Sequence, residues 1–205
     1  MFRRTVADGL ELRQFEWEDA ETLFATVERN REHLRQWLPW VDGTRSVDDI
    51  SQFLTRVTAQ FEDGLGPNFG IWLDGTLAGA IGCHPIDRPN RFCSLGYWIA
   101  MGHQGRGTIT LCCRHLLDYL FDEVSLHRVE VRCGTGNIRS CAIPRRLGFR
   151  HEGVLREAEW VNDRWLDLDV WSMLEQDWRN ARGSLPGRVS SAGGPLRGQP
   201  SEGVS

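Results

Sequence analysis

The segment QGRGT, residues 104–108, has the composition of a phosphate-binding loop. Its two glycines let the backbone approach an anion closely, and the first turn of the helix expected after it has N–H groups without intrahelical partners. These N–H groups and the helix dipole attract a phosphate or a pyrophosphate. The spacing matches neither the GxxxxGK[ST] of nucleotide P-loops nor the GxGxxG of dinucleotide-binding folds, which argues against nucleotide hydrolysis and hydride transfer. Two glycines before a helix also occur in ordinary turns, so the surrounding elements must support this interpretation.

The flanking sequence supplies the strand and the helix that such a loop requires. The apolar run RFCSLGYWIA, residues 91–100, precedes it, and residues 69–86 contain two further apolar runs separated by Asp74-Gly75, a hairpin signal. These three runs predict an antiparallel meander of three strands. After the loop, apolar residues repeat with the period of an amphipathic helix at Ile109, Cys112, Leu116, Leu117 and Leu120.

Hydrophobic periodicity predicts the remaining elements, which place mostly antiparallel strands and flanking helices in one mixed α/β domain. We expect about seven strands, about four helices, a domain over residues 1–180, and a disordered Gly-, Pro- and Ser-rich tail over residues 181–205. Before the meander, the expected elements are a strand at Leu10–Phe15, one helix over Glu16–Leu38 stopped by Pro39, and a helix over Val47–Phe61 capped by Ser46. After the loop helix, they are a strand at Arg128–Cys133, a helix from its cap Asn137 to Gly148, and two strands within 149–174 with a short helical end near Trp178.

The composition excludes several classes of protein. A chain of 205 residues with 40% hydrophobic residues can form one domain with a full core. A net charge of -4 gives no general attraction to nucleic acid or to an acidic membrane. The six cysteines lack zinc-site spacing, and we find neither a signal-peptide pattern nor a continuous apolar stretch of membrane-spanning length. We therefore expect free thiols, no bound metal and a cytoplasmic location.

Two blocks of sequence resemble the acetyl-CoA motifs of the GNAT family of N-acetyltransferases. The first is LGYWIA followed by the loop, and the second is Asn137-Ile138-Arg139-Ser140 followed by the RLGF of residues 146–149. The wider match, which includes the segments REHLRQWLPW and EGVLREAEWVNDRW, resembles the RimJ/RimL-like branch that acetylates ribosomal-protein N-termini. The chain departs from the family pattern at Ile109, where the last small residue of the loop is expected.

The resemblance implies a sheet that splays between the strand ending near Ile99 and the strand Arg128–Cys133, with acetyl-CoA as co-substrate and its pantetheine arm in the gap. Backbone groups near the end of the first strand would bind the pantetheine amides, and an N–H among Ile99–Met101 would stabilise the oxyanion. The cofactor-binding residues that it implies are Trp98, Ile99, Ala100, Met101, Gln104, Gly105, Arg106, Gly107, Thr108, Ile109, Asn137 and Ser140.

The same resemblance implies that Glu159 is the base that deprotonates the amine and that Ser140 is the acid that protonates the CoA thiolate. The alternative for Glu159 is an ordinary solvated carboxylate without a catalytic role. The alternative for Ser140 is a hydroxyl that bonds back to the main chain of its own helical turn. Pro144 supports a special role for Ser140, because proline lacks the N–H that would bond the Ser140 carbonyl, so the helix should loosen or kink there.

The acceptor is less well specified by the sequence. Trp37, Trp40 and Trp160 are candidates to bind it, with core packing as the alternative. The scattered histidines are expected to have surface or hydrogen-bonding roles. We expect a protein N-terminal α-amine, with a small amine such as an antibiotic or polyamine, or a non-catalytic acyl-CoA-binding module, as alternatives. Longer acyl donors remain open, and apolar residues in the last strands suggest a homodimer.

Overall fold

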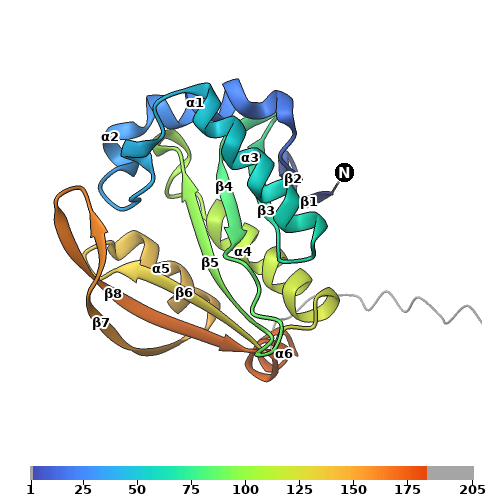
Figure 1. Cartoon of the computed structure of the whole chain (residues 1–205). Helices are drawn as coiled ribbons and strands as arrows, with labels where there is room; N and C mark the ends of the chain where they lie inside the picture. Colours follow the sequence, from blue (N-terminus) through green and yellow to red (C-terminus); the bar gives the residue numbers. More distant parts are fainter. Residues whose placement is uncertain (1, 184–205) are drawn as a thin grey trace, which may run out of the picture.

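The computed structural model describes residues 2–183, and within them eight strands form one sheet in the order β1-β2-β3-β4-β5-β6-β8-β7. Neighbouring strands are antiparallel except β5 and β6, which are parallel. Figure 1 shows the sheet crossing the whole molecule. The strands are β1 (Arg3–Ala7), β2 (Leu10–Gln14), β3 (Asn68–Leu73), β4 (Thr76–Cys83), β5 (Phe92–Ile99), β6 (Arg128–Gly134), β7 (Arg150–Val161) and β8 (Arg164–Leu174).

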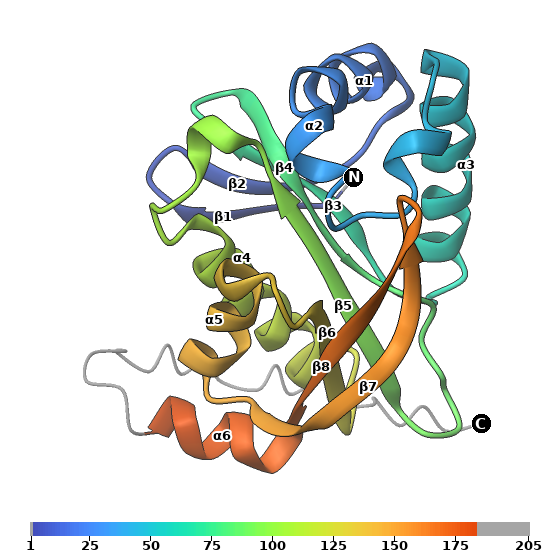
Figure 2. The same ribbon diagram turned by 90° about the vertical axis from the view of Figure 1, so that its left-hand side faces the viewer.

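Helices cover both faces of this sheet, as Figure 2 shows. On one face, α1 and α3 enclose a small core with Trp72 and Leu77 of the sheet, and on the other α4 packs over the main core. The α-helices of the described residues are α1 (Ala20–Arg29), α2 (Arg31–Leu34), α3 (Val47–Glu62), α4 (Thr108–Asp118), α5 (Ile138–Leu147) and α6 (Glu175–Gly183). Short turns of other helix types are η1 (Trp17–Asp19), η2 (Val41–Gly43), η3 (Met101–His103) and η4 (Tyr119–Glu123).

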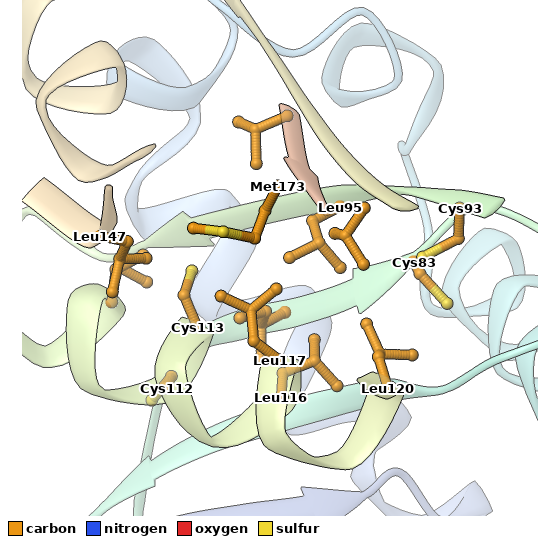
Figure 3. Packing of buried hydrophobic residues seen from close by; sticks show 14 of the residues in the cluster. Cys83, Cys93, Leu95, Cys112, Cys113, Leu116, Leu117, Leu120, Leu147 and Met173 are labelled. Carbon is orange, nitrogen blue, oxygen red and sulfur yellow. The ribbon is translucent and has the colours of Figure 1, made fainter. Parts of the chain in front are cut away.

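The main core fixes α4 against the sheet, and α4 follows the glycine-rich loop directly. Figure 3 shows Cys112, Cys113, Leu116 and Leu117 of α4 and Leu120 of η4 within this core. Apart from Cys113, these are four of the five predicted apolar positions, and the fifth, Ile109, belongs to the same core. Burying side chains of this size contributes roughly 1.5–3 kcal/mol each, so the loop is anchored to a rigid element.

The predicted mixed fold is confirmed, and one strand was missed. The three-stranded meander and its turn at Asp74-Gly75 are present as β3, β4 and β5. The eighth strand is β1, whose sequence RRTVA has too few apolar residues to show a clear alternation. It is held mainly by pairing with β2.

The prediction of one helix over Glu16–Leu38 is wrong, because the helix is interrupted at Asn30, between α1 and α2. This residue leaves helical geometry at φ -115° and ψ 9°. Its side-chain amide donates to the Thr26 carbonyl at 2.8 Å, and its Oδ1 accepts the Met101 N–H at 2.9 Å. A tertiary contact to the chain just before the glycine-rich loop therefore replaces local helix continuity.

The expected splay lies between β5 and β6. Their parallel pairing covers only Phe92–Leu95 of β5 and Arg128–Val131 of β6. Beyond these residues β5 continues to Ile99 and β6 continues to Gly134, and Figure 1 shows the two strands diverging. The diverging ends leave backbone groups of both strands open to a ligand.

The C-terminal helix α6 closes the fold and includes residues 181–183, which we expected at the start of the tail. Arg182 pairs with Asp122 at 2.6 Å and with Asp118 at 3.3 Å. From residue 184 on, the predicted tail lies outside the described residues. Within the described part, none of the helices has the length and apolar character needed to cross a membrane.

Candidate active site

The glycine-rich loop joins η3 to α4 through two residues in left-handed conformation. Gly105 has φ 75° and Gly107, directly before α4, has φ 76°. Both values lie in the region that residues with a Cβ avoid, which explains the glycines physically. The first turn of α4 then directs its N–H groups toward the end of the loop, as an anion site requires.

A cavity of about 1220 Å³ opens at this loop, between α4 and α5. Three arginines line it, Arg106, Arg139 and Arg146, and they suit the phosphates of CoA. Of the predicted cofactor residues, Ala100 alone does not line this cavity, because it is buried and donates its N–H to the Ala78 carbonyl at 2.8 Å. Those that line it are Trp98, Ile99, Met101, Gln104, Gly105, Arg106, Gly107, Thr108, Ile109, Asn137 and Ser140.

The departure at Ile109 has a structural explanation. Ile109 is 7% exposed and belongs to the main core with Cys112 and Cys113 of the same helix. Most of its branched side chain is therefore covered by the core. The residue thus contributes to anchoring α4 below the loop.

Backbone groups at the end of β5 face the gap between the splayed strands. Because Ala100 bonds to β4 and alternate residues of a strand point their N–H groups to opposite edges, the Ile99 N–H points away from β4. The Met101 N–H is already bound by Asn30. Of the three N–H groups expected to include the oxyanion donor, that of Ile99 is the one directed into the gap.

Gln104 connects the loop to the helices on either side. Its side-chain amide lies 2.5 Å from His33 Nε2 of α2 and accepts from Arg139 of α5 at 2.6 Å. Burial, reinforced by the positive charge of Arg139, lowers the pKa of His33. The neutral imidazole can therefore accept a hydrogen bond from the Gln104 amide near neutral pH.

A second cavity, of about 1090 Å³, lies on the side of the sheet covered by α1 and α3. It shares six lining residues with the first cavity, so the two cavities adjoin at these residues. The shared residues are Trp37, Leu38, Tyr97, Trp98, Asn137 and Ser140. Glu159 lines the second cavity, which places both predicted catalytic residues on its wall.

The three predicted acceptor tryptophans occupy different positions. Trp37 and Trp40 line the second cavity, and Trp37 packs so closely on Gly134 and Gly136 that a Cβ there would lie within 3.3 Å of its ring. Trp160 is not among the lining residues. It is 50% exposed and packs edge to face with Trp165 on the β7–β8 hairpin.

Ser140 sits in the first turn of α5 where the two cavities meet. The predicted cap is confirmed, since Asn137 Oδ1 accepts the Ser140 N–H at 3.1 Å. The helix continues through Pro144. The Tyr97 hydroxyl donates to the Ser140 carbonyl at 3.2 Å and lies 3.5 Å from Ser140 Oγ. Tyr97 was missed as a site residue, although Pro144 had indicated that the Ser140 carbonyl lacks its helical hydrogen bond.

Glu159 follows a bulge in β7. The register shifts between Leu155 and Glu159, and Glu157 in the bulge has φ 48° and donates its N–H to Asp167 Oδ1 at 2.8 Å. Burial raises the pKa of Glu159, and the nearby His84 opposes this rise. His84 lines the same cavity and is therefore a site residue. The sequence did not identify it, because no motif distinguishes it from the other histidines.

Within residues 2–183, no cluster of three or more potential ligands could hold a metal ion.

Comparison with known proteins agrees with this geometry. The sequence profile of a family described as an acetyltransferase (GNAT) domain matches residues 9–150. A Bacillus subtilis (strain 168) protein named "Putative ribosomal N-acetyltransferase YdaF" is 35% identical over 183 residues, covering 89% of this chain and 100% of the relative. The ribosomal-protein-serine acetyltransferase of Escherichia coli (strain K12) is 27% identical over 169 residues, covering 82% and 94% of the two chains.

Among solved structures, the microcin C7 self-immunity acetyltransferase MccE, in complex with acetyl-CoA and AMP, superposes with a TM-score of 0.78. It is 25% identical and covers 82% of this chain and 94% of its own. The family profile and the relatives named as acetyltransferases agree with a glycine-rich loop, splayed strands and two adjoining cavities in this chain. The chain belongs to the GNAT family of acetyl-CoA-dependent N-acetyltransferases.

Proposed function

We propose that this enzyme transfers the acetyl group of acetyl-CoA to the N-terminal α-amine of a ribosomal protein. The observation that carries the proposal is the meeting of two cavities at Ser140, one beside the phosphate-binding loop and the other lined by Glu159. The acetyl-CoA would enter from the loop side and the amine from the other. The relatives named as ribosomal-protein acetyltransferases support the choice of acceptor.

Three groups of this site would carry out the reaction: the Glu159 carboxylate, the Ile99 N–H and the Ser140 hydroxyl. The amine nitrogen attacks the thioester carbonyl and loses its proton to Glu159, whose raised pKa makes it a better base than an exposed carboxylate. The Ile99 N–H stabilises the oxyanion. When the carbon–sulfur bond breaks, Ser140 donates its hydroxyl proton to the thiolate, and solvent returns a proton to Ser140 while Glu159 releases the amine proton to solvent. An α-amine, with a pKa of about 7.7–8.0, needs little assistance to become neutral at physiological pH.

Calorimetry with acetyl-CoA and a thiol-release assay test this proposal. Peptides that copy ribosomal-protein N-termini should release CoA, whereas the same peptides with a blocked α-amine and an internal lysine should not. The Ser140→Ala variant should lower kcat by about 100-fold. The proposal would be refuted if acetyl-CoA did not bind, or if peptides with a blocked α-amine released CoA as fast as peptides with a free one.

A small-molecule amine is the second candidate acceptor, and one observation favours it. The structure of MccE, an acetyltransferase of similar fold, contains AMP beside acetyl-CoA. The assay should therefore include antibiotic, polyamine and nucleotide-linked amines in parallel with the peptides. A higher kcat/KM for one of these amines than for every peptide would reassign the acceptor class.

Two expectations about the protein in solution complete the proposal. We propose a cytoplasmic location, which the six free cysteines support. We also propose a homodimer, because β7 is an edge strand with the exposed apolar residues Val154 and Leu155. Light scattering after size exclusion would show a monomer if this second expectation is wrong.

A further inference from the structure

The Ser140 carbonyl lacks the hydrogen bond that a helix normally provides. In α5 its partner would be the N–H of residue 144, and Pro144 has none. Pro144 is buried and Ser140 is half-buried, and the helix continues through both residues. A carbonyl that lacks its helical partner in such surroundings is stabilised by a donor from elsewhere in the fold.

Tyr97 supplies that donor from a different element. Its hydroxyl donates to the Ser140 carbonyl at 3.2 Å, although Tyr97 lies on β5 and Ser140 on α5. Burial raises the pKa of Tyr97 well above its ordinary value, so the phenol remains a donor across the physiological range. The single hydroxyl proton is committed to the carbonyl, which leaves the phenol oxygen as an acceptor for Ser140 Oγ at 3.5 Å.

The contact joins the two sides of the splay at the point of reaction. Tyr97 and Ser140 both line the two cavities, and Tyr97 is two residues before Ile99, whose N–H faces the gap. A bond from residue 144 would fix Ser140 only within its own helix. The bond from Tyr97 instead fixes Ser140 relative to the strand that would hold the oxyanion and the pantetheine.

We propose that Tyr97 is a positioning residue that replaces the missing helical bond of Ser140 and so sets the distance between the proton donor and the strand that carries Ile99. The inference rests on the proposed role of Ser140 as the acid. It predicts that the function of the Tyr97 hydroxyl depends on Pro144, since an N–H at position 144 would serve the same carbonyl.

A double-mutant cycle tests this dependence. Tyr97→Phe removes only the hydroxyl and should lower kcat by about tenfold, because a small misplacement of a catalytic group is costly, with KM for acetyl-CoA unchanged. Pro144→Ala restores the N–H, should be close to wild type alone, and should return the double variant to within about threefold of wild type. Pro144→Ser supplies the same N–H if the alanine variant does not fold.

Two controls separate the ways in which the inference can fail. Tyr119→Phe removes the hydroxyl of the other tyrosine of the chain, which packs against Phe2, and should leave kcat unchanged. If Ser140→Ala keeps wild-type turnover, the proposed acid role fails and the positioning role fails with it. If Ser140→Ala is impaired but Tyr97→Phe is not, or if the position-144 variants do not rescue Tyr97→Phe, the positioning role alone is refuted.

Discussion

The environment of single residues sets the chemistry of this site, and Glu159 shows it most clearly. Its carboxylate is half-buried on the wall of the acceptor cavity, and His84 is the nearby charge that opposes the effect of burial on its pKa. Because burial raises the pKa, the carboxylate gains its proton at a higher pH than an exposed glutamate would. A base of this kind loses activity as the pH falls through that raised pKa.

We therefore predict that kcat/KM falls toward acidic pH through two ionisations, that of the α-amine of the peptide and that of Glu159, the second above the ordinary pKa of a glutamate. Glu159→Gln should lower kcat/KM by about 100-fold and leave only the limb of the α-amine. His84→Gln removes the charge interaction that lowers the Glu159 pKa, so it should move the Glu159 limb to higher pH. A pH profile with each variant measures both effects. An unchanged profile in Glu159→Gln would show that another group deprotonates the amine.

Some site residues could be identified from the sequence and others could not, for physical reasons. Asn137 has a local function as a helix cap, so its identity and position were sufficient to predict its hydrogen bond. Tyr97, His84 and Asn30 act through contacts to distant parts of the chain. No local periodicity reports such contacts, although Pro144 had indicated that the Ser140 carbonyl lacks its helical hydrogen bond.

At the scale of elements, the loop depends on backbone conformation at Gly107. A Cβ at this position would meet no atom within 4 Å, so steric contact does not explain the glycine. Its φ of 76° does, because a left-handed conformation costs a residue with a Cβ about 1–2 kcal/mol.

Gly107→Ala should thus weaken acetyl-CoA binding by about tenfold in calorimetry. Gly102→Ala is the matched control, since a Cβ there also meets nothing within 4 Å and its φ is not in the left-handed region. Equal effects of the two substitutions would contradict a conformational role for Gly107.

The break between α1 and α2 links another element to the cofactor side. Asn30 Oδ1 holds the Met101 N–H, and this bond fixes η3 just before the loop. Its loss costs about 1 kcal/mol. Asn30→Ala should therefore raise the Kd for acetyl-CoA about fivefold.

Asn30→Asp keeps the acceptor oxygen and should retain more affinity than alanine. The same Kd in both variants would show that the contact to Met101 does not support binding. A helix pattern cannot reveal such a break, because Leu34 on the far side of Asn30 is still buried with the same core as Leu23 and Val27. The sequence pattern therefore predicts continuity where a polar tertiary contact ends it.

For the whole molecule, the meander, the loop helix and the capped helix α5 were predictable because each has a strong local pattern. The splay between β5 and β6 was expected only from the resemblance to a family, and the two-cavity arrangement was not predicted. Parallel pairing limited to Phe92–Leu95 depends on how distant segments pack, which spacing along the chain does not encode. The number of strands was underestimated for the same reason, since β1 is defined by its partner β2.

The described fold ends with a well-packed element, and this leads to a prediction about truncation. Trp178 of α6 is 3% exposed, packs against Phe121 and donates its indole N–H to Asp118 at 3.1 Å. Removing so large a buried side chain costs about 3–5 kcal/mol. We predict that a chain ending at residue 183 keeps the Tm and kcat of the full chain, because residues 184–205 are rich in Gly, Pro and Ser and offer little to bury. A chain ending at residue 174 should instead lose a large part of its stability.

Thermal unfolding followed by circular dichroism, with acetyl-CoA turnover measured on the same samples, distinguishes the two truncations. Trp178→Ala in the full chain is the matched variant, and it should reproduce most of the destabilisation caused by ending at residue 174. This follows because Trp178 is the buried side chain among the described residues of α6, whereas exposed ion pairs such as Arg179 with Glu175 contribute about 0–1 kcal/mol each. If ending the chain at residue 183 already lowers the Tm or kcat, the last 22 residues, 184–205, take part in the folded enzyme, and the assignment of the domain to the residues before them is wrong.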